Sequence, residues 1–89
     1  MTTPEEKVRV AAAMKALRER VARTQDAFAA RCGIDRTHII HIEKGRNALT
    51  SFAMRAKVAA GIGVSTDALS SYIDGVTSLD ELLSAPRAA

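Results

Sequence analysis

The sequence predicts an all-α domain, and three observations lead to this prediction. Apolar residues recur at intervals of three and four along most of the chain, which is the spacing of one helix face. Alanine supplies much of the hydrophobic fraction of 47%, and alanine favours helices that pack closely. Glycines and capping residues divide the chain into short helical segments. A chain of 89 residues is expected to form one compact domain.

The first expected helix begins after Thr3, which can act as its N-cap, and has Pro4 in its first position. It is expected to continue to Ala22. Its inward face is predicted from four apolar residues at helical spacing: Val10, Met14, Leu17 and Val21.

A second and a third helix are expected to follow in quick succession. Thr24 starts the second helix, residues 25–32, and Gly33 ends it as a left-handed cap. Asp35 is expected to cap the third helix, residues 36–44, which stops at the following glycine.

These two helices meet the steric demands of a helix-turn-helix. The second helix of such a unit lies steeply across the first, so the crossing needs a small residue, and Ala29 supplies it. Gly33 allows the turn. The predicted apolar anchors are Ile34 in the turn and, on the inner side of the third helix, Ile39 and Ile42.

A fourth helix is expected after a connecting loop of residues 46–49. Thr50 or Ser51 caps it, and it extends to Gly61. Its predicted inward residues are Phe52, Ala56, Ala59 and Ile62.

Two further segments complete the helical pattern. Ser65 is expected to cap a fifth helix that continues to about Tyr72. Ser78 and Glu81 then form a capping box, which opens a short amphipathic segment through Leu83.

The positive charge of the chain is concentrated in its first half. Residues 1–47 hold ten Lys or Arg and six acidic residues, whereas residues 48–89 hold three basic and four acidic ones. The formal net charge of the whole chain is +3. This distribution favours an acidic partner for the first half.

The cysteine content and hydropathy point to the cytoplasm. Cys32 is the only cysteine, so no intrachain disulfide can form, and it is expected to be a small core residue. The sequence contains no apolar run of transmembrane length and no recognisable secretion signal. A cytoplasmic protein without a membrane partner is therefore expected.

In their order and spacing, these motifs resemble the XRE, or Cro/C1-type, helix-turn-helix family. The resemblance rests on TQDAFA at 24–29, CGID at 32–35, IIHIEKGR at 39–46 and GVSTDAL at 63–69. It covers about residues 10–70 and implies a five-helix λ-repressor-like fold, followed here by a short helical extension. The chain departs from the family at Arg23, where leucine is usual, and at Cys32, where leucine is common.

The resemblance also implies a DNA-binding surface, with the third helix in the major groove. The residues expected to contact bases are the outward ones of this helix: Arg36, Thr37, Ile40 and His41. The residues expected to contact phosphates lie at the start of the second helix and after the third: Gln25, Lys44, Arg46 and Asn47. The alternative interpretation is that these are ordinary solvent-exposed helix and turn residues.

The remaining polar residues indicate a structural ion pair but no metal site and no catalytic site. The family position of Glu43 pairs with a basic residue elsewhere in the domain, for which Arg18 or Arg31 is available. His38 and His41 are three residues apart, but no third ligand accompanies them at a clear spacing, so no metal or other cofactor is expected. The sequence shows no nucleophile–base set and no Gly-rich phosphate loop, so it does not predict an enzyme.

The expected function is sequence-specific transcriptional regulation, with repression favoured, by a homodimer bound to double-stranded operator DNA. The sequence does not choose among a phage-type repressor, an antitoxin with a toxin partner, and a restriction–modification controller. An alternative from another class is a protein–protein adaptor that uses Ile40 and the C-terminal leucines without binding DNA.

The expected domain organisation is a helix-turn-helix domain over residues 4–73 and a C-terminal extension over residues 74–89 that contributes to dimerisation. The near-neutral half carries an aliphatic cluster without an obvious intrachain partner. The residues expected at the dimer interface are Leu69, Tyr72, Ile73, Leu79, Leu82 and Leu83. The alternative is that residues 79–83 fold back onto the first helix.

Overall fold

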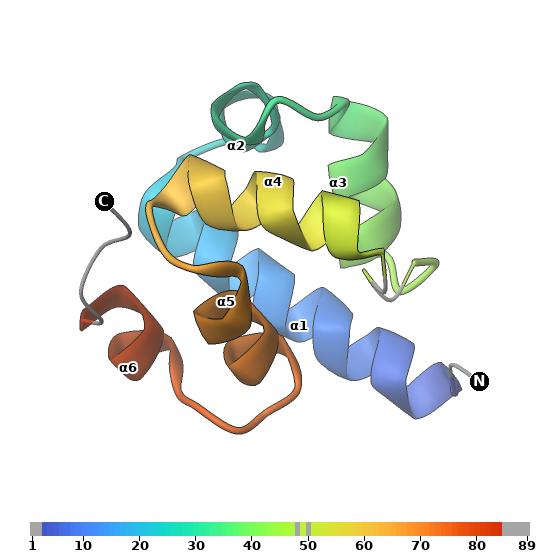
Figure 1. Cartoon of the computed structure of the whole chain (residues 1–89). Helices are drawn as coiled ribbons and strands as arrows, with labels where there is room; N and C mark the ends of the chain where they lie inside the picture. Colours follow the sequence, from blue (N-terminus) through green and yellow to red (C-terminus); the bar gives the residue numbers. More distant parts are fainter. Residues whose placement is uncertain (1–2, 48, 50, 85–89) are drawn as a thin grey trace.

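The computed structural model describes residues 3–47, 49 and 51–84, and within them the chain forms six helices (Figure 1). These are α1 (Pro4–Val21), α2 (Gln25–Cys32), α3 (Arg36–Glu43), α4 (Phe52–Ile62), α5 (Thr66–Ile73) and α6 (Leu79–Ser84). The prediction of an all-α fold is confirmed, and the helix ends lie within about one residue of the predicted ones. Thr50 and the end of the predicted extension, residues 85–89, lie outside the described residues.

Side-chain caps start most helices where the sequence predicts them. The hydroxyl oxygen of the cap accepts the N–H three residues later, at 3.0–3.4 Å, in Thr3, Thr24, Ser51 and Ser65. Ser78 and Glu81 form the predicted capping box, with both bonds present. The prediction for Asp35 was wrong in part. It occupies the N-cap position of α3, but its carbonyl oxygen, rather than its side chain, accepts from the N–H of His38.

The turn between α2 and α3 gives the helix-turn-helix its shape. Gly33 ends α2 in the left-handed region, at φ 67°, and α3 then crosses α2 steeply (Figure 1). Ile34 is only partly buried, although it was predicted as a buried anchor, and it packs against the core. Ile39 and Ile42 are buried as predicted.

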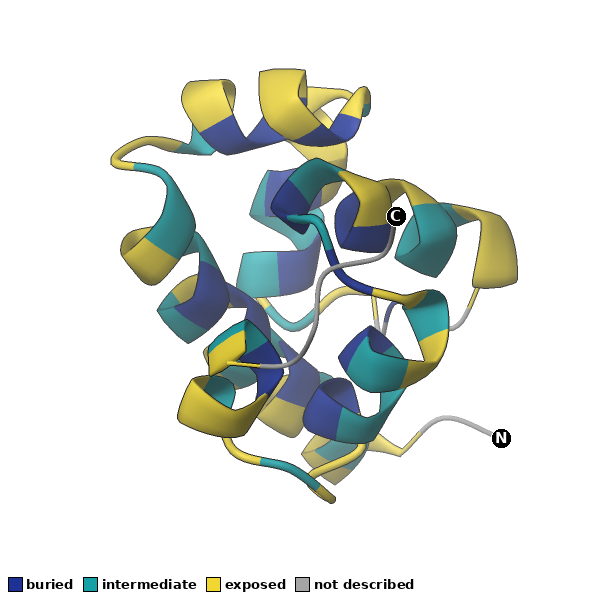
Figure 2. Cartoon of the chain, turned by 60° about the vertical axis from the view of Figure 1, so that its left-hand side comes forward, coloured by how far each residue is buried: buried dark blue, intermediate teal, exposed yellow. Residues whose placement is uncertain are grey.

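The core is built from the inner faces of all six helices (Figure 2). α1 contributes Val10, Met14 and Leu17, in agreement with its predicted face. Cys32 is a buried core residue, and desolvation by burial raises the pKa of its thiol to about 11. The thiol therefore stays protonated near neutral pH.

The predicted inward face of α4 needs one correction. Ala59 and Ile62 are buried, but Phe52 is 71% exposed at the first position of the helix. The buried residue in this part of the chain is Leu49, which enters the core from the loop with φ 53°. Its carbonyl oxygen accepts from Arg55 Nε at 2.6 Å, and this bond ties the loop to α4.

The C-terminal aliphatic cluster has partners within its own chain, contrary to the prediction. Four of the six residues proposed for a dimer interface are buried in the core: Leu69, Tyr72, Ile73 and Leu82. The hydroxyl of Tyr72 donates to the carbonyl oxygen of Ala13 in α1 at 2.6 Å. Leu79 and Leu83 are partly buried against the same core. These residues are buried because α5 and α6 complete the core that α1 to α4 leave open.

An ion pair anchors α3 to α1. Arg18 Nε and Nη2 donate to the two carboxylate oxygens of Glu43 at 2.7 and 3.1 Å, so Arg18, rather than Arg31, is the partner of Glu43. The side chains are only 12% and 7% exposed. The hydrogen bond to Glu43 raises the pKa of Arg18, and burial acts in the opposite direction.

A close contact sets the spacing of α2 and α4. A Cβ atom placed on Gly61 would lie 2.7 Å from Cys32 Sγ and 2.9 Å from Cys32 Cα. Arg31 reinforces this contact, because its guanidinium donates to the carbonyl oxygens of Gly61 and Val21 at 3.0 and 3.2 Å. The end of α2 is thereby bonded to the ends of both α4 and α1.

No helix among the described residues combines the length and the apolar character needed to cross a membrane.

We predict that Gly61→Ala destabilises the fold by about 1–3 kcal/mol, because its Cβ would push against the backbone of α2. Ala60→Gly is the matched control at an exposed neighbouring position, where helix propensity dominates. Urea unfolding should show that alanine is more stabilising than glycine at position 60 and less stabilising than glycine at position 61. A stabilised Gly61→Ala variant would contradict the close contact.

We predict that Glu43→Ala destabilises the fold by about 2–3 kcal/mol, because it leaves the largely buried Arg18 guanidinium without its partner. The double variant Arg18→Met, Glu43→Leu removes both charges and should recover most of this loss. Chemical denaturation of the wild type and the two variants compares their free energies of unfolding. Equal losses in the single and the double variant would show that the loss does not come from the unpaired Arg18 guanidinium.

Candidate nucleic-acid interface

The outer face of α3 is the centre of the candidate site. A helix advances 100° per residue, so positions 36, 37, 40, 41 and 44 lie on one side of α3, opposite Ile39 and Ile42. Arg36 and Thr37 are exposed, whereas Ile40 and His41 are partly buried. The structure thus places all four predicted base-contacting residues on one face.

The loop after α3 continues this face with exposed cations. Lys44 caps the C-terminus of α3, and Lys44 and Arg46 are both exposed. The N–H of Arg46 donates to the carbonyl oxygen of His41, which holds the loop against α3. Asn47 has a structural bond as well, because its side-chain oxygen accepts from the N–H of Leu49 at 2.8 Å.

Gln25 lies at the first position of α2 and is partly buried. Its side-chain amide donates to Glu43 Oε1 at 3.4 Å, so it is drawn into the ion pair that anchors α3. This contact was not foreseen from the sequence. It connects the start of α2 to the last residue of α3.

A second unforeseen contact involves Arg36 itself. Its Nε lies 3.2 Å from Oδ1 of Asp26, the second residue of α2, and both side chains are largely exposed. The sequence places an acidic residue near the start of α2 and a basic residue at the start of α3, but their proximity depends on the angle between the two helices. The starts of the two helices are therefore linked by charge.

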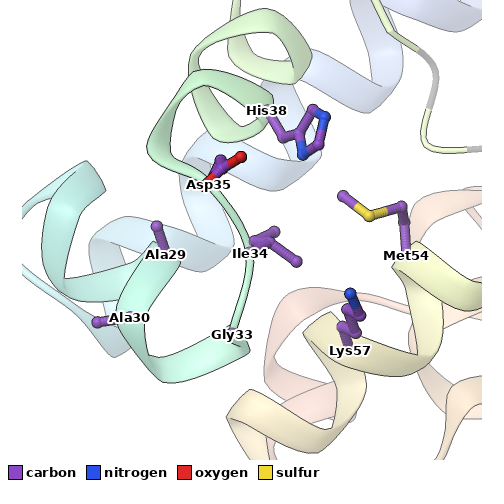
Figure 3. Close-up of a pocket in the computed structure, with 8 residues that line it drawn as sticks. All are labelled: Ala29, Ala30, Gly33, Ile34, Asp35, His38, Met54 and Lys57. Carbon is purple, nitrogen blue, oxygen red and sulfur yellow. The ribbon is translucent and has the colours of Figure 1, made fainter.

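A hollow of about 320 Å³ lies beside the site, between the turn and α4 (Figure 3). In Figure 3 the side chain of Ile34 points from the turn toward Met54 and Lys57 of α4, and His38 closes one side. The lining combines small and apolar residues with two side chains of opposite charge, Asp35 and Lys57. Among the described residues, no three His, Cys, Asp or Glu side chains are grouped as a metal site would require.

Comparison with known proteins identifies the unit that carries this surface. The sequence model of a helix-turn-helix domain family matches residues 9–71, which include most of α1, all of α2 to α4 and most of α5. Neither the curated proteins nor the solved structures contain a significant match to the chain. The residues that face outward on α3 therefore belong to the second helix of a recognised helix-turn-helix, and the chain is a member of the helix-turn-helix domain family, within the XRE/Cro/C1-like group.

Proposed function

We propose that the protein is a transcriptional regulator that binds operator DNA by inserting α3 into the major groove. The observation that carries this proposal is the outer face of α3, which offers four side chains able to contact base edges within a helix-turn-helix of matching family. The expectation of repression rests on the same surface, because a protein that covers a promoter blocks access to it.

The side chains on α3 have the chemistry for reading bases. The guanidinium of Arg36 can donate two hydrogen bonds to guanine, and His41 can donate to a base acceptor. Thr37 can bond a base or a phosphate, and Ile40 can contact a thymine methyl group. Ile40 is partly covered within the chain, so its contact would involve the exposed remainder of the side chain.

Phosphate contacts are proposed for the residues that flank α3. Lys44 and Arg46 are exposed and follow the helix directly. Asn47 uses its side-chain oxygen within the loop, which leaves its amide N–H₂ for a phosphate. Gln25 donates to Glu43, so a phosphate contact there would use its second amide hydrogen or the backbone N–H groups at the start of α2.

We also propose that the protein binds as a homodimer, because one helix reads few base pairs and a two-fold pair reads two half-sites about 34 Å apart. Of the six residues predicted for the dimer interface, Leu79 and Leu83 are partly exposed in the monomer and the other four are buried. The adaptor alternative loses support from the same burial, since two of the four C-terminal leucines that it would use, Leu69 and Leu82, are buried.

We predict salt-dependent binding to double-stranded DNA. The logarithm of the affinity should fall by about 0.9 per phosphate neutralised for each unit of log salt concentration, so Lys44 and Arg46 together give a slope of about −2 per subunit. Fluorescence anisotropy with a random duplex over a range of salt concentrations measures the slope. A slope near zero would contradict the proposed DNA-binding function and favour the protein–protein adaptor.

We predict that Arg36→Ala and Arg46→Ala have different effects on binding. Arg36→Ala should weaken the preference at one base pair of a site selected from random DNA, by about 1–3 kcal/mol. Arg46→Ala should weaken binding to all sequences alike and make the salt slope shallower by about one unit per subunit. Identical behaviour of the two variants would contradict the division into base and phosphate contacts. A palindromic selected site would support the dimer.

A further inference from the structure

The Asp26–Arg36 ion pair includes Arg36, one of the residues proposed to contact bases. Asp26 is the second residue of α2 and Arg36 is the first residue of α3, so the pair joins the starts of the two helices of the helix-turn-helix. The side chains are 75% and 59% exposed, respectively. Exposed pairs of this kind add little to the stability of a fold.

The start of α2 does not need Asp26 for its cap, because Thr24 already accepts the N–H of Ala27. An acidic residue in the first turn still gains from the helix dipole. Asp67 has the same place in α5, as its second residue after a capping Ser65. A helix-dipole role alone would therefore make Asp26 and Asp67 equivalent.

The atoms used by the pair distinguish Asp26. The closest approach of the carboxylate is Oδ1 to Nε of Arg36, at 3.2 Å, so Asp26 lies at the Nε edge of a planar group whose Nη groups are further donors. A guanidinium that reads guanine needs two donors presented together in a fixed orientation. A carboxylate beside Nε favours one orientation of that plane before DNA arrives.

We propose that Asp26 is a specificity-determining positioning residue, which holds the Arg36 guanidinium so that its two Nη groups meet a guanine edge. This inference rests on the proposed function. Asp26 also adds a negative charge to a surface that approaches phosphates, so it opposes binding that depends on the backbone alone. Asp26 thus favours the selected sequence over random DNA.

The experiment uses the full chain and sites selected by the wild-type protein from random duplex DNA. The base pair whose preference is lost in Arg36→Ala is identified first. Asp26→Ala should then reduce the preference at that base pair by about fivefold, the lower end of what one bidentate contact provides, without weakening binding to random duplex DNA. In the Arg36→Ala background, Asp26→Ala should cause no further loss of preference.

Two more variants separate positioning from a general charge effect. Asp26→Glu keeps the carboxylate and should restore part of the base preference. Asp67→Ala removes an acid from the equivalent place in α5 and should leave the base preference unchanged, while thermal unfolding reports the helix-dipole contribution of each acid.

The proposal is overturned if Asp26→Ala changes the affinity for the selected and the substituted site by the same factor. It is also overturned if the losses from Asp26→Ala and Arg36→Ala simply add, or if Arg36→Ala itself removes no base preference. Failure of the wild-type protein to bind any duplex is a separate result, which would refute the proposed function as well.

Discussion

The ion pair between Arg18 and Glu43 is the constraint on which the position of α3 depends. It joins the long α1 to the last residue of α3 through two hydrogen bonds, in a place from which water is largely excluded. Ile39 and Ile42 fix which side of α3 faces inward, but apolar contacts are not directional. The bidentate pair adds direction, so it limits both sliding and rotation of α3. The outward face keeps its orientation for that reason.

The packing of α2 against α4 is a second constraint. The turn sets the angle of α3 relative to α2, so the position of α3 depends on a fixed position of α2. Gly61 brings the two helices so close that no side chain fits between them. Arg31 then donates to carbonyl groups at the ends of α1 and α4, which a helix leaves without internal partners. A short helix of eight residues gains a fixed place through contacts at its C-terminal end.

Sequence patterns predicted most of the fold because caps and glycines act locally. Thr24, Gly33 and Ser65 mark helix boundaries through bonds or φ angles that involve only near neighbours. The errors arose where burial depends on distant elements. Phe52 fits the apolar face of α4 by periodicity, yet it is the first residue of the helix and is exposed. Leu49, from the preceding loop, is buried in the core instead. Likewise, the outward face of α3 followed from periodicity, whereas the Asp26–Arg36 contact depends on the angle between two helices.

The arginines of this chain show why net charge alone describes a binding surface poorly. Arg18 is used by Glu43, and Arg31 by two carbonyl groups. Arg55 bonds the carbonyl oxygen of Leu49 and pairs with Asp74 at 3.5 Å. A guanidinium has five donors in a rigid fork, which suits the task of tying helix ends and loops together. These three charges hold the scaffold, so the field that an acidic partner meets depends on the few cations that remain exposed around α3, and a single acid such as Asp26 can change it substantially.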